Sequence, residues 1–297
     1  MTLRRKLLPT FTAIAAGQTA TCNLDLGKRY HIIWLELGNN AVAANALSDL
    51  VNEIRVKING KVQRTHTAVE LNACNGVNGS IYTEKTSGTD GQANRRHYLP
   101  IYFAEPWRNG NAEAQAMALN AVGINSFSVE LDVKAGLAAP IVQGFYEYDS
   151  AVRGDPGYFT KWIRQTLGAV GTVQDFNTID RRDFLQAIHL FPTTGTSVRV
   201  NSVKFTLNGE AILDAITTLE NQAMLLVRGM NPDTAGLARF DLVFDHDDPI
   251  NNALATAPNG ERATEMTLHV EYSDNAGVAA AANGNLVATI IRTGQME

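Results

Sequence analysis

The alternation of apolar and polar residues is clearest in residues 54–60, where Ile-Arg-Val-Lys-Ile leads into Asn59-Gly60. A period of two predicts a strand with one buried face. Asn-Gly is typical of a two-residue hairpin turn, because both residues tolerate positive φ. The same pattern returns in residues 203–209, which read Val-Lys-Phe-Thr-Leu-Asn-Gly. The chain is therefore expected to carry two equivalent hairpins.

The segments around the two hairpins recur in the same order. Self-similarity over a long period indicates repeated units, so we expect two copies of one β-domain. Short strands, long loops and few helices favour jelly-roll connections, and the expected fold class is all-β, two tandem jelly-roll β-barrels with short helices in loops. The paired segments are apolar runs at 30–37 and 184–191, strands at 99–103 and 240–244, Ala-containing stretches at 112–122 and 251–257, and alternating strands at 127–133 and 266–272.

Turn residues and shifts in composition give the expected domain boundaries. Aromatic and aliphatic residues at near-helical spacing in 158–167, just after Pro156-Gly157, predict a short helix. The expected ranges are an N-terminal basic arm at 1–20, a first jelly roll at 21–135, a connector with the short helix at 136–183, a second jelly roll at 184–292 and a tail at 293–297.

Further helices and loops are expected between the strands. Residues 113–122 are rich in Ala, and residues 211–226 place apolar residues about one helical turn apart, so both predict helices. Residues 75–96 and 277–285 are rich in small and polar residues and predict exposed loops. Residues 286–291 predict a last apolar strand.

Composition and charge narrow the possible functions. With 297 residues, of which 45% are hydrophobic, the chain can build two cores, and a charged fraction of 19% fits a protein that hides much of its surface against neighbours. A net charge of −5 gives no support for direct nucleic-acid binding, which calls for a basic excess. Cys22 and Cys74 have no metal-ligand spacing, and we expect free thiols in a reducing compartment.

The N-terminal residues Arg4, Arg5 and Lys6 form a short basic cluster. The apolar run after it is interrupted by Pro9 and by threonines, which argues against a secretory signal. No stretch of the sequence approaches the roughly 20 apolar residues that a membrane span needs. Two interpretations remain: a solvated arm, or a basic arm that contacts anionic lipid. The three basic residues are the candidate site of the chain.

The sequence gives no positive sign of catalysis. His246 and Asp248 together with His269 have the residue types of a facial triad for non-haem iron, but His269 follows too closely for strands on opposite sides of such a site. Asp245, Asp247 and Asp248 could hold a hard cation such as calcium, or form an exposed turn that caps a helix. We predict no catalytic residue, no metal ligand and no cofactor.

Several segments in a fixed order carry a family resemblance. The chain resembles the double jelly-roll major capsid proteins of tailless, membrane-containing icosahedral phages, with the layout of a corticovirus-like coat protein. The resemblance extends over about residues 8–273 and rests on the order of the motifs, since none is a catalytic signature. The motifs are Ala15-Ala16-Gly17, residues 54–60, residues 121–124 leading into 126–133, residues 187–190, residues 203–209, and Val270-Glu271-Tyr272.

The resemblance implies a structural protein of the virion rather than an enzyme. In such a family the chain forms a homotrimer, a pseudo-hexagonal capsomer that tiles an icosahedral shell around an internal membrane. Expected partners are neighbouring capsomers, minor capsid proteins and, through the N-terminal arm, the viral membrane. The expected location is the virion capsid, after assembly in the host cytoplasm.

Two other classes remain open at the level of sequence. A jelly-roll spike that binds a receptor or carbohydrate would also be rich in strands and lack catalytic residues. A non-haem iron enzyme on jelly rolls would need histidines clustered on inward-facing strand positions, and the spacing found here argues against one.

Overall fold

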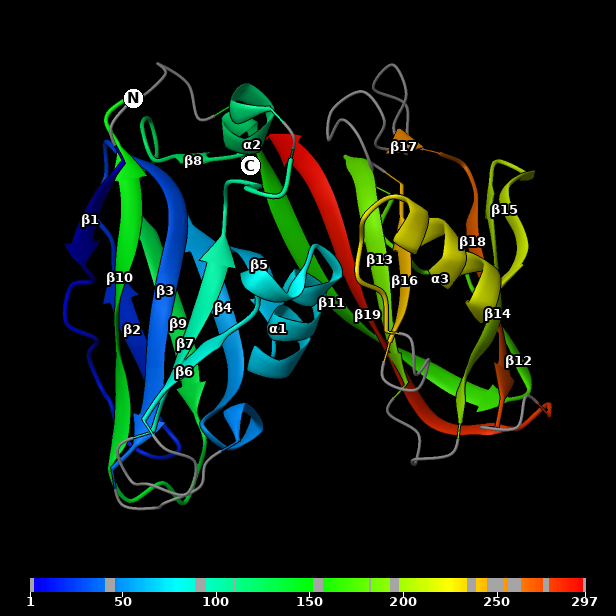
Figure 1. The fold of residues 1–297 in the computed structure, drawn as a ribbon, viewed down its shortest axis with the longest axis horizontal. Coiled ribbons are helices and arrows are strands. Elements are labelled where there is room, and N and C mark those ends of the chain that lie inside the picture. The colour runs from blue at the N-terminus through cyan, green and yellow to red at the C-terminus, as the bar shows by residue number, and fades with distance from the viewer. Residues whose placement is uncertain are drawn as a thin grey trace. The chain divides into compact units, whose positions relative to one another are not determined.

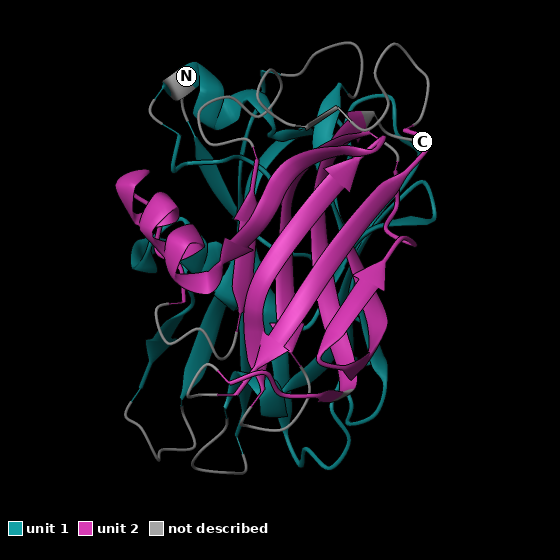
Figure 2. Ribbon diagram, turned by 90° about the vertical axis from the view of Figure 1, so that its right-hand side faces the viewer, with its two compact units in different colours: residues 1–162, 295–297 teal, residues 163–294 magenta. Residues whose placement is uncertain are grey.

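The computed structural model describes residues 3–40, 46–88, 95–108, 110–151, 157–181, 183–192, 198–233, 239–244, 254–255, 263–274 and 278–295. The chain divides into two compact units (Figure 2). Unit 1 comprises residues 1–162 and 295–297, and unit 2 comprises residues 163–294. Strands dominate both units, which confirms the expected all-β class (Figure 1).

Unit 1 is built from two sheets. The first has the strand order β1-β10-β3-β7-β6, with β8 beside β3. The second has the order β5-β4-β9-β2, and the start of β11 pairs in parallel with β5. The strands are β1 (Arg4–Leu7), β2 (Thr19–Asn23), β3 (Arg29–Asn39), β4 (Val51–Ile58), β5 (Lys61–His66), β6 (Lys85–Ser87), β7 (Arg96–Tyr102), β8 (Leu119–Asn120), β9 (Phe127–Val133), β10 (Pro140–Asp149) and β11 (Tyr158–Gly171).

Unit 2 repeats this arrangement. One sheet has the order β11-β19-β13-β16, with β17 beside β13, and the other has the order β15-β14-β18-β12. Eight strands of unit 2 have a counterpart at the same place in unit 1. In chain order, the counterparts of β1, β2, β3, β4, β5, β7, β9 and β10 are β11, β12, β13, β14, β15, β16, β18 and β19. The strands are β12 (Val173–Phe176), β13 (Phe184–Pro192), β14 (Arg199–Leu207), β15 (Glu210–Thr217), β16 (Phe240–Val243), β17 (Leu254–Ala255), β18 (Met266–Ser273) and β19 (Ala282–Gln295).

One helix follows the hairpin in each unit, and both helices begin in the same way. Thr67 caps α1 (Ala68–Val77) and Thr217 caps α3 (Thr218–Val227), each accepting a hydrogen bond from the backbone N–H of a glutamate three residues later. The glutamate side chain accepts from the N–H of the capping threonine in return. This reciprocal pair satisfies two N–H groups that the first helical turn leaves without partners. The capping boxes therefore fix the point at which strand turns into helix.

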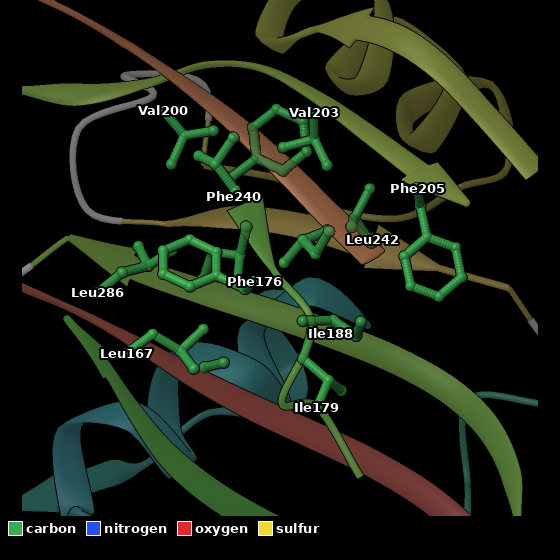
Figure 3. Close-up of a cluster of buried hydrophobic side chains, with 14 of the residues drawn as sticks. Leu167, Phe176, Ile179, Ile188, Val200, Val203, Phe205, Phe240, Leu242 and Leu286 are labelled. Carbon is green, nitrogen blue, oxygen red and sulfur yellow. The ribbon is translucent and has the colours of Figure 1, made fainter. Parts of the chain in front are cut away.

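The alternating strands were predicted correctly. On β9, Phe127, Val129, Leu131 and Val133 are buried, while the residues between them are half-buried. Strand β18 shows the same alternation. In unit 2 the buried side chains meet between the two sheets (Figure 3). That core includes Leu167, Phe176, Ile188, Val203, Phe205, Leu242, Leu268 and Leu286.

The expected connector is wrong in its boundaries and in its helix. Strand β10, within 136–149, belongs to unit 1, and residues 158–167 lie in strand β11. Aromatic and β-branched side chains such as Phe159, Thr160 and Ile163 suit a strand, and pairing with neighbouring strands overrides their helical spacing. Pro156 lies outside the described residues.

Other expectations held only in part. Residues 113–122 contain the end of helix α2 (Asn111–Ala116) and strand β8 rather than one helix. Residues 211–226 divide into β15 and α3, because the return strand of the hairpin takes the first half. The expected loop at 75–96 contains a 3-10 turn at Ser80–Tyr82 and strand β6, and its residues 89–94 lie outside the described part. Strand β19 begins within the expected loop 277–285 and contains the predicted strand 286–291.

Candidate functional site

The N-terminal basic cluster lies on a paired strand and not on a free arm, and its side chains are exposed, as expected of a solvated segment. Strand β1 pairs antiparallel with β10, with Arg4 opposite Tyr148 and Leu7 opposite Phe145. The N–H of Leu8 continues the ladder by donating to the carbonyl of Gly144 at 2.9 Å. The open edge of β10 supplies partners for backbone groups that water would otherwise solvate. Residues 4–8 are therefore fixed to unit 1.

The basic side chains of β1 are exposed, and two of them form ion pairs. Arg5 donates from Nε to Glu147 Oε1 at 2.8 Å, and Lys6 donates from Nζ to Asp25 Oδ2 at 2.8 Å. Arg4 forms no ion pair with any residue that the structure describes. The pairs reduce the positive charge that the cluster presents to a partner.

Asp25 is the centre of the polar contacts below β1. It accepts hydrogen bonds from Lys28 and Lys6, and also from the Tyr146 hydroxyl at 3.1 Å. The hydrogen bonds from the two lysines hold the pKa of Asp25 well below its usual range. The bond to Asp25 also raises the pKa of Lys6. Both lysines remain charged at neutral pH. The bond between Lys6 and Asp25 holds the N-terminal segment against the rest of unit 1.

A second ionic group lies at the end of β10. Asp149 accepts from Arg29 Nη2 at 2.8 Å and lies against the Nε2 atom of His31. Burial opposes its charge, but the hydrogen bonds from Arg29 and His31 lower the pKa of Asp149. Burial lowers the pKa of His31. The arrangement is a satisfied buried ion pair, not a base held ready for proton transfer.

The histidines that the structure describes each pair with a different partner or stand alone, and they form no common cluster. His97 lies 2.9 Å from Glu84, His189 lies 2.7 Å from Asp241, and His269 lies 2.6 Å from Asp175. Among the described residues, no three side chains of the metal-binding types converge. The other members of the expected iron or calcium groups, residues 245–248, lie outside the described part of the chain.

Sequence reasoning missed a buried polar pair on β5. Arg64 is 1% exposed, and it donates to the carbonyls of Thr160 at 2.7 Å and Tyr102 at 2.6 Å. Burial lowers the pKa of Arg64 to about 9. His66, two residues on, lies edge-on to the Trp162 ring. The sequence signal was a strand whose inward positions carry an arginine and a histidine.

Comparison with known families decides the identity. The family model described as viral coat protein P2 N-terminal domain matches residues 5–149, and the model described as viral coat protein P2 C-terminal domain matches residues 159–290. The chain belongs to the viral coat protein P2 family. This viral coat protein is thus a structural protein of the virion capsid, and the predicted resemblance is confirmed.

Solved capsid proteins share the fold of this P2-family chain. The major capsid protein P2 of bacteriophage PM2 is 15% identical, with a TM-score of 0.77 over 100% of this chain and 98% of that one. The PBCV-1 virus capsid protein is 12% identical, with a TM-score of 0.67 over 98% and 93%. The STIV major capsid protein is 9% identical, with a TM-score of 0.66 over 99% and 96%. These likenesses confirm the predicted double jelly roll.

Two further findings complete the comparison. Among curated proteins, none matches the chain. In the described residues, no helix has both the length and the apolar character to cross a membrane.

Proposed function

We propose that this P2-family coat protein forms a homotrimer, a pseudo-hexagonal capsomer that tiles an icosahedral shell around an internal membrane. The observation that supports it most strongly is the strand-by-strand repeat of one jelly roll in a single chain. Three copies of a two-unit chain contain six similar units, so a threefold object can offer nearly sixfold contacts to its neighbours. Neighbouring capsomers and minor capsid proteins are the partners of such a unit, and assembly takes place in the host cytoplasm.

The mass of the purified protein in solution tests the trimer. Light scattering coupled to size exclusion should give about three times the chain mass of 32.2 kDa, unchanged on moderate dilution. A closed symmetric ring should also leave no larger open-ended species. A monomer at every concentration would contradict the proposal, as would a stable dimer.

The proposed membrane contact lies in β1. Arg4, Arg5, Lys6 and exposed Leu7 of the strand, with exposed Leu3 just before it, form a mixture of basic and apolar groups that suits an anionic lipid surface. Because Arg5 and Lys6 already pair with Glu147 and Asp25, each copy of β1 binds lipid weakly. A shell presents many copies of β1 to one membrane, and multivalency compensates for the weakness of each contact.

Vesicle binding tests this contact. We expect the variant with Arg4, Arg5 and Lys6 changed to Ser to bind vesicles with anionic lipid more weakly than the parent. Moderate salt should weaken binding of the parent, because it screens the charges. A variant with Lys61, Lys85 and Arg228 changed to Ser carries the same change of net charge elsewhere on the chain and serves as the control. If the β1 variant binds as the parent does, β1 is not the membrane contact.

A further inference from the structure

Unit 1 buries polar side chains at positions where unit 2 has apolar ones. Arg64 and His66 of β5 pair with the two β4 residues that lie three and five positions before the turn asparagine. On β15 of unit 2, the residues with the same pairing are Leu213 and Ile216. The jelly roll therefore does not require an arginine or a histidine at these positions.

Four side chains around β5 have polar atoms without a hydrogen-bond partner among the described residues. Strand β11 runs parallel to β5 with Trp162 opposite Arg64, and Thr160 lies two residues earlier on the same face of β11. The atoms are Nη2 of Arg64, both ring nitrogens of His66, Nε1 of Trp162 and Oγ1 of Thr160. All four residues are at most 7% exposed. Buried polar groups without a partner are rare, and a bound water molecule or ion is a common explanation for them.

The guanidinium and the two rings lie close together. The Cζ atom of Arg64 lies 5.8 Å from the centroid of the Trp162 ring, and the centroid of the His66 ring lies 5.6 Å from the same point. The Nε and Nη1 atoms of Arg64 donate to two backbone carbonyls, at 2.7 Å and 2.6 Å. These bonds fix the guanidinium and leave its Nη2 atom to donate to a further acceptor.

The unpartnered groups call for an acceptor that carries negative charge. Nη2 of Arg64 and Nε1 of Trp162 can only donate, whereas the threonine hydroxyl and the imidazole can also accept. Arg64 is charged at neutral pH, because burial lowers its pKa only to about 9. Glu105 acts on Arg64 electrostatically but pairs with Arg108 at 3.0 Å, so two guanidinium groups and one carboxylate leave a net charge of +1. A buried charge is costly unless it is paired, and a water molecule cannot neutralise it.

We infer that unit 1 binds a chloride ion in its core, between β5 and the start of β11. Arg64 Nη2, Trp162 Nε1 and the hydroxyl of Thr160 donate to the ion, and the neutral ring of His66 lies beside it. A monatomic anion accepts hydrogen bonds from several directions and is small enough for a site that solvent does not reach. Its donors come from two strands, so the ion holds the start of β11 to β5. The inference is independent of the proposed trimer, because all of these residues belong to unit 1 of one chain.

Urea denaturation tests the site when chloride is exchanged stepwise for gluconate at constant ionic strength. An anion that binds only the folded chain lowers the equilibrium constant of unfolding about tenfold for each tenfold rise in its concentration above the dissociation constant. We expect this dependence in the parent and its loss in Arg64→Leu, which introduces the residue type found at the equivalent position of unit 2. The control, Arg228→Leu, removes an exposed arginine of α3 and should keep the dependence.

Bromide locates the ion directly. Crystals of the parent grown with bromide in place of chloride should show anomalous scattering from one ion in contact with Arg64 and Trp162. No bromide at this position overturns the inference, and this measurement also decides the matter if Arg64→Leu does not fold.

Three outcomes of the denaturation experiment contradict the inference. Equal stability of the parent in chloride and in gluconate shows that the buried groups bind water only. A chloride dependence that persists in folded Arg64→Leu shows that the anion binds elsewhere. An equal loss of the dependence in Arg228→Leu shows that the effect follows net charge and not this site.

Discussion

Asn59 and Asn208 perform the same task in the two hairpins. Their φ angles are 51° and 52°, and each precedes a glycine with positive φ. Asn59 Oδ1 accepts from the N–H of Asn125 at 2.7 Å and from the N–H of Ser126 at 3.4 Å. Asn208 Oδ1 accepts from the N–H of Thr264 at 2.8 Å and from the N–H of Glu265 at 3.3 Å. In each unit the turn residue therefore also fixes the start of the neighbouring strand in the sheet, β9 in unit 1 and β18 in unit 2.

Replacement of Asn59 by Ala should destabilise unit 1. Alanine loses the hydrogen bonds to the strand start and is strained at positive φ, for a total of about 1–3 kcal/mol. Asn59→Gly removes the same hydrogen bonds without the strain and should cost less. Chemical denaturation of both variants separates the cost of the lost hydrogen bonds from the cost of the backbone strain. Equal stability of Asn59→Ala and the parent would show that the turn does not depend on this side chain.

His66 couples the stability of unit 1 to pH. The ring is fully buried, and neither nitrogen has a hydrogen-bond partner among the described residues. Burial and the nearby charge of Arg64 lower the pKa of His66 to about 3. The unfolded chain takes up a proton near pH 6.5, and the folded chain does not. Stability is therefore lost as the pH falls from about 6.5 toward 3.

His66→Phe should make the protein less sensitive to mild acid. Below pH 6.5, His66 makes the free energy of unfolding fall by at most about 1.4 kcal/mol per pH unit. The variant removes this contribution. Urea denaturation at pH 7, 6 and 5 measures the slope in a range where most carboxylates of the unfolded chain still carry charge. A weaker slope remains from His31, whose pKa is also lowered by burial. Parallel pH profiles for variant and parent would contradict the assignment.

At the scale of elements, strands with one buried face were predictable, and strands with other surroundings were not. Strands β9 and β18 alternate cleanly, because one face meets the core and the other meets water. Strand β11 has no such period, since Phe159, Thr160, Lys161 and Trp162 are buried in succession. A run of that kind is ambiguous between helix and strand until its pairing partners are known.

The capping boxes offer a test at the same scale. Thr67→Ala should lower the free energy of unfolding by about 1 kcal/mol, because the N–H of Glu70 loses its acceptor. Thr67→Ser keeps the hydroxyl and should restore most of the stability. Thermal denaturation compares the three proteins. If the Ser and Ala variants are equally destabilised, the methyl group of Thr67 matters rather than the cap.

At the scale of the whole molecule, the sequence located the basic cluster but not its partners. Three adjacent basic residues are visible in any reading of the chain. Glu147 approaches them through the β1–β10 register, and Asp25 lies on the segment between β2 and β3, so neither contact can be read from the sequence. The repeat was visible from the two Asn-Gly hairpins. The sequence did not show which of the two helices is exposed, because α1 and α3 have similar caps and similar apolar content.

The two cysteines report on the integrity of unit 1. Cys22 and Cys74 are 0% and 2% exposed, and burial raises the pKa of Cys22 to about 11. The thiolate is the reactive form, so a thiol reagent at pH 8 should not label the folded protein and should label two thiols after denaturation. The Cys74→Ser variant keeps only the thiol of Cys22, which should react slowly with the reagent while the protein is folded. Fast labelling of either cysteine in the native protein would contradict this prediction.

Strand β15 is the outermost strand of its sheet among the described residues, and this edge has a consequence for the newly made chain, before any particle exists. An unpaired strand edge is a template for fibrous aggregation, and the hazard grows with the concentration of free chains. Residues 214–215 interrupt the pairing of β15 with β14 by a bulge in which Ala215 has φ 51°, and Asp214 adds an exposed charge. Bulges and charges discourage stacking of like edges. The edge thus disfavours uncontrolled growth during the interval between synthesis and incorporation into a shell.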